Sequence, residues 1–278
     1  MENPKLNEIQ DWWNTKIIDI QPGIIRVRGY PIEQLIGSVS FPQMIWLMLR
    51  GELPSANQAS LLEAALVAAV DHGPQAPSIS MARMAMTCGV HINNAMASAI
   101  NVLGDVHGGA GQQCMQLYHE VAELENLSAS TLEAARQVVN ERLSNKRMIE
   151  GFGHRFHPED PRSDRLLRIA EDAVQKGTIS GRYVTIGKAV EAALREAKGS
   201  QLIPMNIDGV TAVIYAELKF PIELARGLFI ISRSVGILSH AWEQSQQGER
   251  IKGPMPPSVS YRYDGPEPRK LVENSDEQ

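Results

Sequence analysis

The sequence predicts an all-α fold with a small N-terminal β-hairpin. Apolar residues make up 43% of the 278 residues and charged residues 21%, which is ordinary for a packed globular protein. Apolar residues recur three or four positions apart through most of the chain, and capping residues bracket these runs. Strand patterns are confined to residues 17–28 and 259–263. We therefore expect roughly ten helices and little sheet.

The two strand segments at the N-terminus are expected to pair. Residues 17–20 and 24–28 are rich in isoleucine and flank Pro22-Gly23, a turn-forming pair. Residues 259–263 predict a second extended piece near the C-terminus, and the polar tail from Asp264 is expected to fray.

Capping residues predict where the helices begin and end. Serine followed three residues later by Gln or Glu is a capping-box spacing, and proline favours the first helical turn. Glycine favours the end of a helix. Helices are therefore expected to begin at Ser40, Ser55, Ser130 and Asp160. The first of these is expected to end at Gly51 and the last at Gly177. Three more helices are expected to cover residues 182–198, 207–218 and 223–247.

Charge and cysteine content narrow the class of protein. Lys and Arg number 27 and Asp and Glu 32, a net charge of −5 that argues against nucleic-acid binding. Cys88 and Cys114 are the two cysteines, which favours a reducing compartment. The N-terminus lacks the pattern of a secretory signal, and charges interrupt the most apolar runs, so no membrane span is expected. These features predict a cytoplasmic protein.

Three segments combine ionisable groups with glycine: residues 104–111 around His107, residues 151–162 with His154 and His157, and residues 206–209 with Asp208. Taken singly, each is more often a loop histidine or a helix cap than a functional group. The pair His154 and His157 lacks a third ligand at suitable spacing, so no metal site is expected. The glycines complete neither a dinucleotide-binding fingerprint nor a phosphate-binding loop.

Taken together, these segments and their neighbours resemble the citrate synthase superfamily over nearly the whole chain. The matching words follow in the family's order: Arg28-Gly29-Tyr30-Pro31-Ile32-Glu33 with Leu49-Arg50-Gly51-Glu52-Leu53-Pro54, Asp71-His72-Gly73, Val106-His107-Gly108-Gly109, Gly151-Phe152-Gly153-His154-Arg155, Asp160-Pro161-Arg162, Asn206-Ile207-Asp208 and Ile231-Ser232-Arg233. Asp71-His72-Gly73-Pro74 and Asn206-Ile207-Asp208-Gly209 are most similar to the citryl-CoA lyase branch, which includes the C-terminal module of ATP-citrate lyase.

The resemblance implies two helical domains and a homodimer. Residues 1–106 and 206–278 would form the large, dimerising domain, and residues 107–205 a small domain that closes over the substrates. The middle of the chain, residues 112–199, is richer in charge than its flanks, which agrees with an inserted smaller domain.

The resemblance also assigns roles to individual residues. Asp208 would be the base at the α-carbon of a CoA thioester, and His107 the neutral donor to the thioester oxygen. His154 would exchange a proton with the oxygen of the 2-oxo acid. Arg162, Arg233 and His72 would bind the dicarboxylate.

One expected group departs from the family pattern. Citrate synthases usually supply a third arginine from the partner subunit, and Gly253 stands at that position in Arg250-Ile251-Lys252-Gly253-Pro254. Lys252 or Arg250 is the candidate replacement. The basic rim that CoA needs has Arg155, Arg165 and Lys198 as candidates. The other histidines, His91, His119, His157 and His240, are expected to be structural.

The expected function is the making or breaking of a carbon–carbon bond between acetyl-CoA and oxaloacetate. Citryl-CoA cleavage is the first hypothesis, and citrate synthesis with thioester hydrolysis is the alternative. A relative that uses another 2-oxo acid or acyl-CoA, and a non-catalytic CoA-binding paralogue, also stay open. The partners are acyl-CoA and di- or tricarboxylates, and the chemistry needs no metal or redox cofactor.

Overall fold

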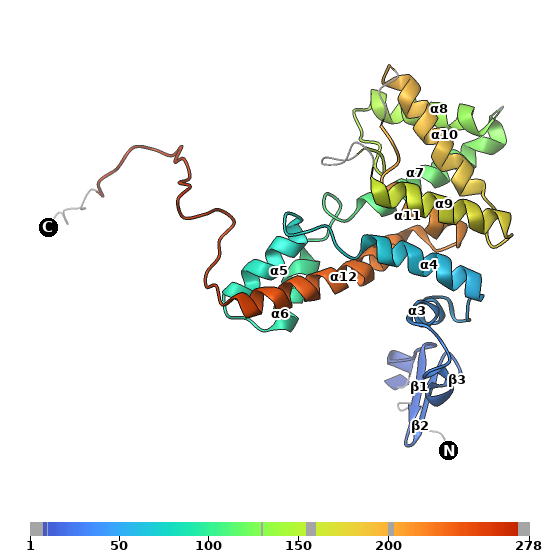
Figure 1. Ribbon diagram of the computed structural model, residues 1–278, viewed down its shortest axis with the longest axis horizontal. Helices are drawn as coiled ribbons and strands as arrows, with labels where there is room; N and C mark the ends of the chain where they lie inside the picture. Colours follow the sequence, from blue (N-terminus) through green and yellow to red (C-terminus); the bar gives the residue numbers. More distant parts are fainter. Residues whose placement is uncertain (1–7, 10, 129, 154–159, 200–202, 272–278) are drawn as a thin grey trace.

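The computed structural model describes residues 8–9, 11–128, 130–153, 160–199 and 203–271. Within these ranges almost all of the regular secondary structure is helical, which confirms the predicted fold class (Figure 1). The helices are α2 (Ile32–Leu35), α3 (Phe41–Arg50), α4 (Ala56–Ala69), α5 (Pro77–Thr87), α6 (Ile92–Asn101), α7 (Ala110–Leu124), the 3-10 helix η1 (Glu125–Leu127), α8 (Thr131–Ser144), α9 (Pro161–Gln175), α10 (Arg182–Ala197), α11 (Ile207–Glu217) and α12 (Ile222–Gln247).

The predicted hairpin is present at the N-terminus. Strand β1 (Ile18–Gln21) pairs antiparallel with β2 (Ile24–Val27), and the short β3 (Tyr30–Pro31) adds to the other side of β2. The expected extended piece at residues 259–263 is wrong, because these residues form no strand and are exposed. They follow a proline-rich stretch that removes backbone donors, and no described strand lies beside them to complete a ladder.

The predicted helix starts are confirmed. Ser40 and Ser55 each form a complete capping box with the glutamine three residues later. Ser130 accepts a hydrogen bond from the backbone of Glu133 at the start of α8. Asp160 caps α9 by accepting from the backbone nitrogen of Arg162.

Besides the single-turn α2, the capping patterns in the sequence did not indicate helices α5, α6 and α7. The residues that precede them, Ala76, His91 and Gly109, make no side-chain capping bond. Tertiary packing stabilises these helices instead, since each buries apolar residues against its neighbours.

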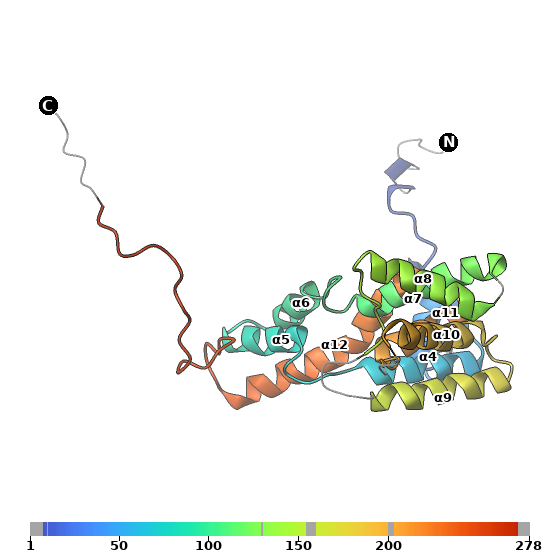
Figure 2. The same cartoon turned by 90° about the horizontal axis from the view of Figure 1, so that it is seen from above.

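A small apolar cluster joins β2, α2 and α3. Most of the other helices gather around two buried apolar clusters that share α12. The larger one holds residues of α3, α4 and α7–α11 together with the N-terminal half of α12. The smaller one packs α5 and α6 against the C-terminal half of α12. Figures 1 and 2 show α5 and α6 beside that half of α12, and the other helices at its N-terminal end. The domain boundaries given above stay predictions.

None of the helices in the described ranges combines the length and the apolar character that a membrane span requires.

Two glycines allow three chain segments to meet at the start of α11. A Cβ atom on Gly209 would overlap the carbonyl oxygen of Gly151, and one on Gly151 would overlap the sulfur of Cys114 in α7. Gly151 also has φ +87°, a conformation that side chains with a Cβ rarely adopt. The start of α11 therefore lies directly against both α7 and the segment at residue 151.

We expect Gly209→Ala to destabilise the protein by about 1–3 kcal/mol, because the added methyl group overpacks this contact. Gly227→Ala is the matched control, since Gly227 also lies within a helix and a Cβ there would meet nothing within 4 Å. The control is expected to gain up to about 1 kcal/mol from helix propensity. Urea unfolding of both variants measures the difference, and equal stabilities would contradict the packing described.

Candidate active site

Asp208 lies in the first turn of α11, held by the cap of that helix. The side chain of Asn206 accepts hydrogen bonds from the backbone nitrogens of Asp208, at 2.9 Å, and Gly209, at 3.2 Å. Burial raises the pKa of the Asp208 carboxyl, and the guanidinium groups of Arg162 and Arg233 oppose that change. A carboxylate made more basic by burial is suited to take and return a proton.

The segment that leads to His154 is paired with the segment that leads to Asp208. Gly153 donates to the carbonyl of Pro204 at 2.8 Å, and Asn206 donates from its backbone to Gly151 at 2.9 Å. The Asn206 amide also donates to the carbonyl of Gly153 at 2.6 Å. His154 and Arg155 lie outside the described residues, so their roles stay predictions.

His107 lies in the loop between α6 and α7 and contacts the start of α5. Its Nε2 accepts a hydrogen bond from the backbone nitrogen of Ser78 at 3.1 Å, and the Ser78 hydroxyl lies 3.0 Å from the same atom. A backbone N–H can only donate, so Nε2 carries no proton and a neutral ring carries it on Nδ1. Burial lowers the pKa of His107, and the charge of Arg233 lowers it further. The site therefore favours a neutral imidazole with Nδ1–H available as a donor.

Arg233 is buried on α12 and is held from two sides. Its Nε donates to the carbonyl of Ala69 at 3.1 Å, and its guanidinium lies 4.8 Å from the ring centre of Phe229. Burial lowers its pKa, while the carboxylates of Asp71 and Asp208 oppose that change. Arg233 is thus a buried cation close to the candidate base, and not a surface charge.

Arg162 pairs with the carboxylate that caps its own helix. Its Nε and Nη2 donate to the two oxygens of Asp160, at 2.9 and 2.8 Å. Asp160 is buried, and its Oδ2 also accepts from the backbone nitrogen of Ile207 at 3.2 Å. This pairing ties the start of α9 to the start of α11, and it leaves Nη1 as the nitrogen that Asp160 does not use.

The structure brings these groups together around the start of α11. A Cβ on Gly111, four residues after His107, would lie 3.9 Å from Oδ1 of Asp208. The charge of Arg233 acts on both His107 and Asp208, and that of Arg162 acts on Asp208. The neighbourhood of an imidazole, a carboxylate and two arginines can exchange a proton and bind an anion.

The other predicted site residues lie in turns, beyond helix ends or on exposed helix faces. His72 is half-buried in the turn between α4 and α5, next to Asp71. Arg250 and Lys252 are exposed beyond the end of α12, where Lys252 pairs with Glu249 and its backbone donates to Thr87 of α5. Arg165 on α9 and Lys198 after α10 are exposed. The functional roles of these residues stay predictions.

Three residues of this neighbourhood were not singled out from the sequence: Ser78, Asp71 and Asp160. Asp160 stands in the family word Asp160-Pro161-Arg162, where it was assigned only the start of a helix. Ser78 carries no sequence signal, because its backbone nitrogen is the donor. Of the histidines expected to be structural, His119 lies 3.3 Å from the hydroxyl of Tyr183, and His240 contacts Asp71.

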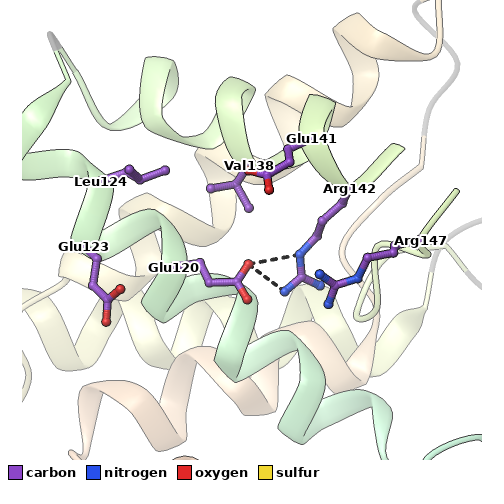
Figure 3. Close-up of a pocket in the computed structure, with 7 residues that line it drawn as sticks. All are labelled: Glu120, Glu123, Leu124, Val138, Glu141, Arg142 and Arg147. Atoms are coloured by element: carbon purple, nitrogen blue, oxygen red, sulfur yellow. Dashed lines mark hydrogen bonds and ion pairs between the residues drawn. The ribbon is translucent and has the colours of Figure 1, made fainter. Parts of the chain in front are cut away.

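A separate polar hollow of about 270 Å³ lies between α7 and α8. Figure 3 shows Arg142 pointing into it and bonding to Glu120, with Arg147 alongside. Arg142 is 3% exposed and also pairs with Glu150. The buried cation thus ties α8 to α7 and to the segment before Gly151, and none of the predicted site residues lines this hollow.

The all-α fold places a carboxylate, an imidazole and two arginines near the start of α11, which suits the site to proton transfer and to binding of an anion. The model of the citrate synthase family, described as its C-terminal domain, matches residues 10–61 and 55–254. The chain therefore belongs to the citrate synthase family.

Individual relatives agree with this assignment. The chain is 30% identical over 207 residues to a citrate synthase of Deinococcus radiodurans, covering 74% of this chain and 52% of that protein. It spans about half the length of the curated relatives it matches.

Among solved structures, the citryl-CoA lyase of Hydrogenobacter thermophilus is 31% identical, with a TM-score of 0.83 over 94% of this chain and 97% of that one. A citrate synthase of Thermoplasma acidophilum, solved with carboxymethyl coenzyme A and oxaloacetate, has a TM-score of 0.70 at 24% identity. The match covers 86% of this chain and 61% of the Thermoplasma chain, and it supports the fold alone.

The lowered pKa of His107 predicts a pH-dependent stability. In the unfolded protein His107 binds a proton as the pH falls through about 6.5, whereas in the folded protein it does so only at lower pH. Between these two pH values the unfolded state therefore holds more protons than the folded state. Unfolding free energy is therefore expected to fall as the pH drops below about 6.5. In His107→Gln the decrease between about pH 7.5 and 5.5 should be smaller than in the unmodified protein, as measured by urea unfolding. Equal decreases would contradict the neutral state of His107.

Proposed function

We propose that this protein cleaves citryl-CoA to acetyl-CoA and oxaloacetate. The observation that carries the proposal is the match to the citryl-CoA lyase of Hydrogenobacter thermophilus, which extends over nearly the full length of both chains. The citryl-CoA lyase-like words around Asp71 and Asp208 agree with it.

The site chemistry supports such a cleavage. The tertiary hydroxyl of citryl-CoA loses its proton to His154, and the adjacent carbon–carbon bond breaks. The hydroxyl carbon becomes the ketone of oxaloacetate, while the bonding electrons pass into the thioester as an enolate. Nδ1–H of His107 stabilises the enolate oxygen by a hydrogen bond, and the protonated carboxyl of Asp208 gives its proton to the α-carbon, which completes acetyl-CoA. A raised pKa suits Asp208 to this last step.

The cationic groups fit a ligand with several carboxylates. Arg233 is buried beside the candidate base, and Arg162 keeps Nη1 for a further acceptor. With His72 they would bind the oxaloacetate portion. We further propose a homodimer in which Lys252 or Arg250 of one chain reaches the site of the other, and a CoA rim formed by Arg155, Arg165 and Lys198.

The reaction defines the remaining requirements. Acid–base groups suffice for it, so coenzyme A enters as the thioester of the substrate and no cofactor is required. Cys88 and Cys114 are free thiols, which supports a reducing compartment such as the cytoplasm.

Citrate synthesis is the second candidate function, because the curated relatives are citrate synthases. Both reactions use the same carbon–carbon chemistry. They differ in whether water reaches bound citryl-CoA and hydrolyses its thioester.

Incubation of the purified protein with synthetic citryl-CoA separates the two functions. A lyase releases equal amounts of oxaloacetate and acetyl-CoA, whereas a synthase releases citrate and free CoA. Oxaloacetate is measured with malate dehydrogenase and free thiol with a disulfide reagent. Free CoA forming faster than acetyl-CoA would replace the lyase proposal by the synthase one, and no turnover of either kind, with CoA still bound, would favour a non-catalytic paralogue.

Asp208→Asn is expected to lower turnover at least 10²-fold, the usual minimum for loss of an acid–base group. The same variant should be more stable than the unmodified protein at pH 7. A carboxyl whose pKa is raised by burial is least stable when ionised, and the amide removes that charge. Turnover and thermal unfolding of the same preparation test both expectations. A variant that is less stable, or as active as the parent, would contradict the role given to Asp208.

A further inference from the structure

Arg83, His240 and Asp71 form a hydrogen-bond network next to the candidate site. None of the three is among the residues to which a catalytic or binding role is assigned above. His240 Nε2 lies 3.2 Å from Oδ2 of Asp71, and its Nδ1 lies 3.2 Å from Nη1 of Arg83. A guanidinium can only donate, so Nδ1 accepts and the ring proton resides on Nε2, directed at Asp71. The hydrogen bonds of this network therefore run in one direction, from Arg83 through His240 to Asp71.

Arg83, at the outer end of this network, is held by several hydrogen bonds. Arg83 on α5 pairs with Glu243 and donates to Oε1 of Gln247 at 2.8 Å, both on α12. Its side chain is only 14% exposed. One ion pair and two further hydrogen-bond contacts to the same guanidinium hold this side chain in one geometry. Arg83 thus orients His240, and through it Asp71.

Asp71, at the inner end of this network, lies toward Arg233. Arg233, Gly236 and His240 lie on one face of α12, three and four residues apart, so all three face the end of α4. A Cβ on Gly236 would overlap the carbonyl of Val70 and lie 3.0 Å from Oδ1 of Asp71. This close approach brings the Asp71 carboxylate between His240 and Arg233.

The two oxygens of Asp71 have different surroundings. Oδ2 accepts from the backbone of Gly73 at 3.1 Å and contacts His240. Oδ1 is buried and has no hydrogen-bond partner among the described residues. Burying a carboxylate oxygen without a hydrogen-bond donor costs free energy of folding. The negative charge of Asp71 also acts on Arg233 and raises the pKa of its guanidinium. Attraction to the Arg233 guanidinium is the compensation that the described residues offer.

On the basis of the proposed function, we propose that Asp71 is a positioning residue, held by His240 and Arg83, that orients Arg233 and the turn carrying His72 for binding of the substrate carboxylate. Asp71 touches no reacting atom in this role. It acts through the direction of the Arg233 guanidinium and through its bond to Gly73, which shapes the turn at His72. Nε of Arg233 donates to the carbonyl of Ala69, and the charge of Asp71 attracts the remainder of the guanidinium.

The test compares oxaloacetate binding and citryl-CoA kinetics among variants of this chain. Asp71→Asn should weaken oxaloacetate binding and raise KM on the order of tenfold, because removal of the Asp71 charge ends its attraction to the Arg233 guanidinium. Because Arg233 would bind substrate and transition state alike, kcat should stay within about threefold. His240→Leu should have the same effect, and Asp71→Asn with His240→Leu should be no worse than either alone.

Rescue by a conservative variant separates positioning from packing. His240→Gln keeps an N–H for Asp71 and an oxygen for Arg83, so binding should return to within about twofold of the parent value. Val139→Ala, a cavity variant in the buried core of α8, is the control for reduced stability and should leave both constants unchanged. Binding unaffected by Asp71→Asn, or equal losses in His240→Gln and His240→Leu, would overturn the proposal.

The outcome is distinguishable from failure of the proposed function. If the unmodified protein binds oxaloacetate without cleaving citryl-CoA, the lyase proposal fails. Comparison of the oxaloacetate affinities of the variants then still tests the role of Asp71. If it cleaves citryl-CoA and KM does not respond to Asp71→Asn, the role of Asp71 fails and the lyase proposal stands.

Discussion

The close contact between Gly151 and Gly209 is the constraint on which the candidate site depends. Because neither residue has a Cβ, the backbone after α8 can lie directly on the first turn of α11. That contact brings the segment leading to His154 against the Asn206 cap and, through Cys114, against α7. Asp208 then lies half-buried near the two arginines, and desolvation is the first cause of its raised pKa. Backbone packing and acid–base chemistry are therefore linked at one point.

Much of the fold could be predicted because its helices carry local signals. Ser40, Ser55 and Asp160 begin helices where their side chains can satisfy free backbone nitrogens. Helices α5 and α6 lack such caps and are stabilised by packing on α12, which a local pattern does not report. The extended segment expected at residues 259–263 failed for the converse reason, since a strand pattern forms no strand without a partner.

The candidate site was predictable in residue type and order but not in its supporting contacts. His107, Arg233 and Asp208 stand in recognisable words, and the structure brings them into one neighbourhood. What fixes the state of His107 is a backbone nitrogen, that of Ser78, which any residue except proline would supply. The bond from Asp71 to His240 joins positions 169 residues apart. Such contacts depend on tertiary packing, and one sequence does not encode them as a motif.

Charge balance gives the site its most specific character. Arg162 is neutralised by Asp160 through two hydrogen bonds, and Arg233 faces the charges of Asp71 and Asp208. Among the described residues of this neighbourhood, carboxylates thus match or outnumber arginines. A ligand with several carboxylates requires additional positive charge, or protonation of Asp208, before it binds favourably. The proposed cleavage of citryl-CoA also needs protonated Asp208 for its last step, so binding of the polyanion and proton return to the α-carbon would favour the same protonation state. The remaining charge deficit is the physical reason for the proposal that Lys252 or Arg250 of a second copy reaches the site.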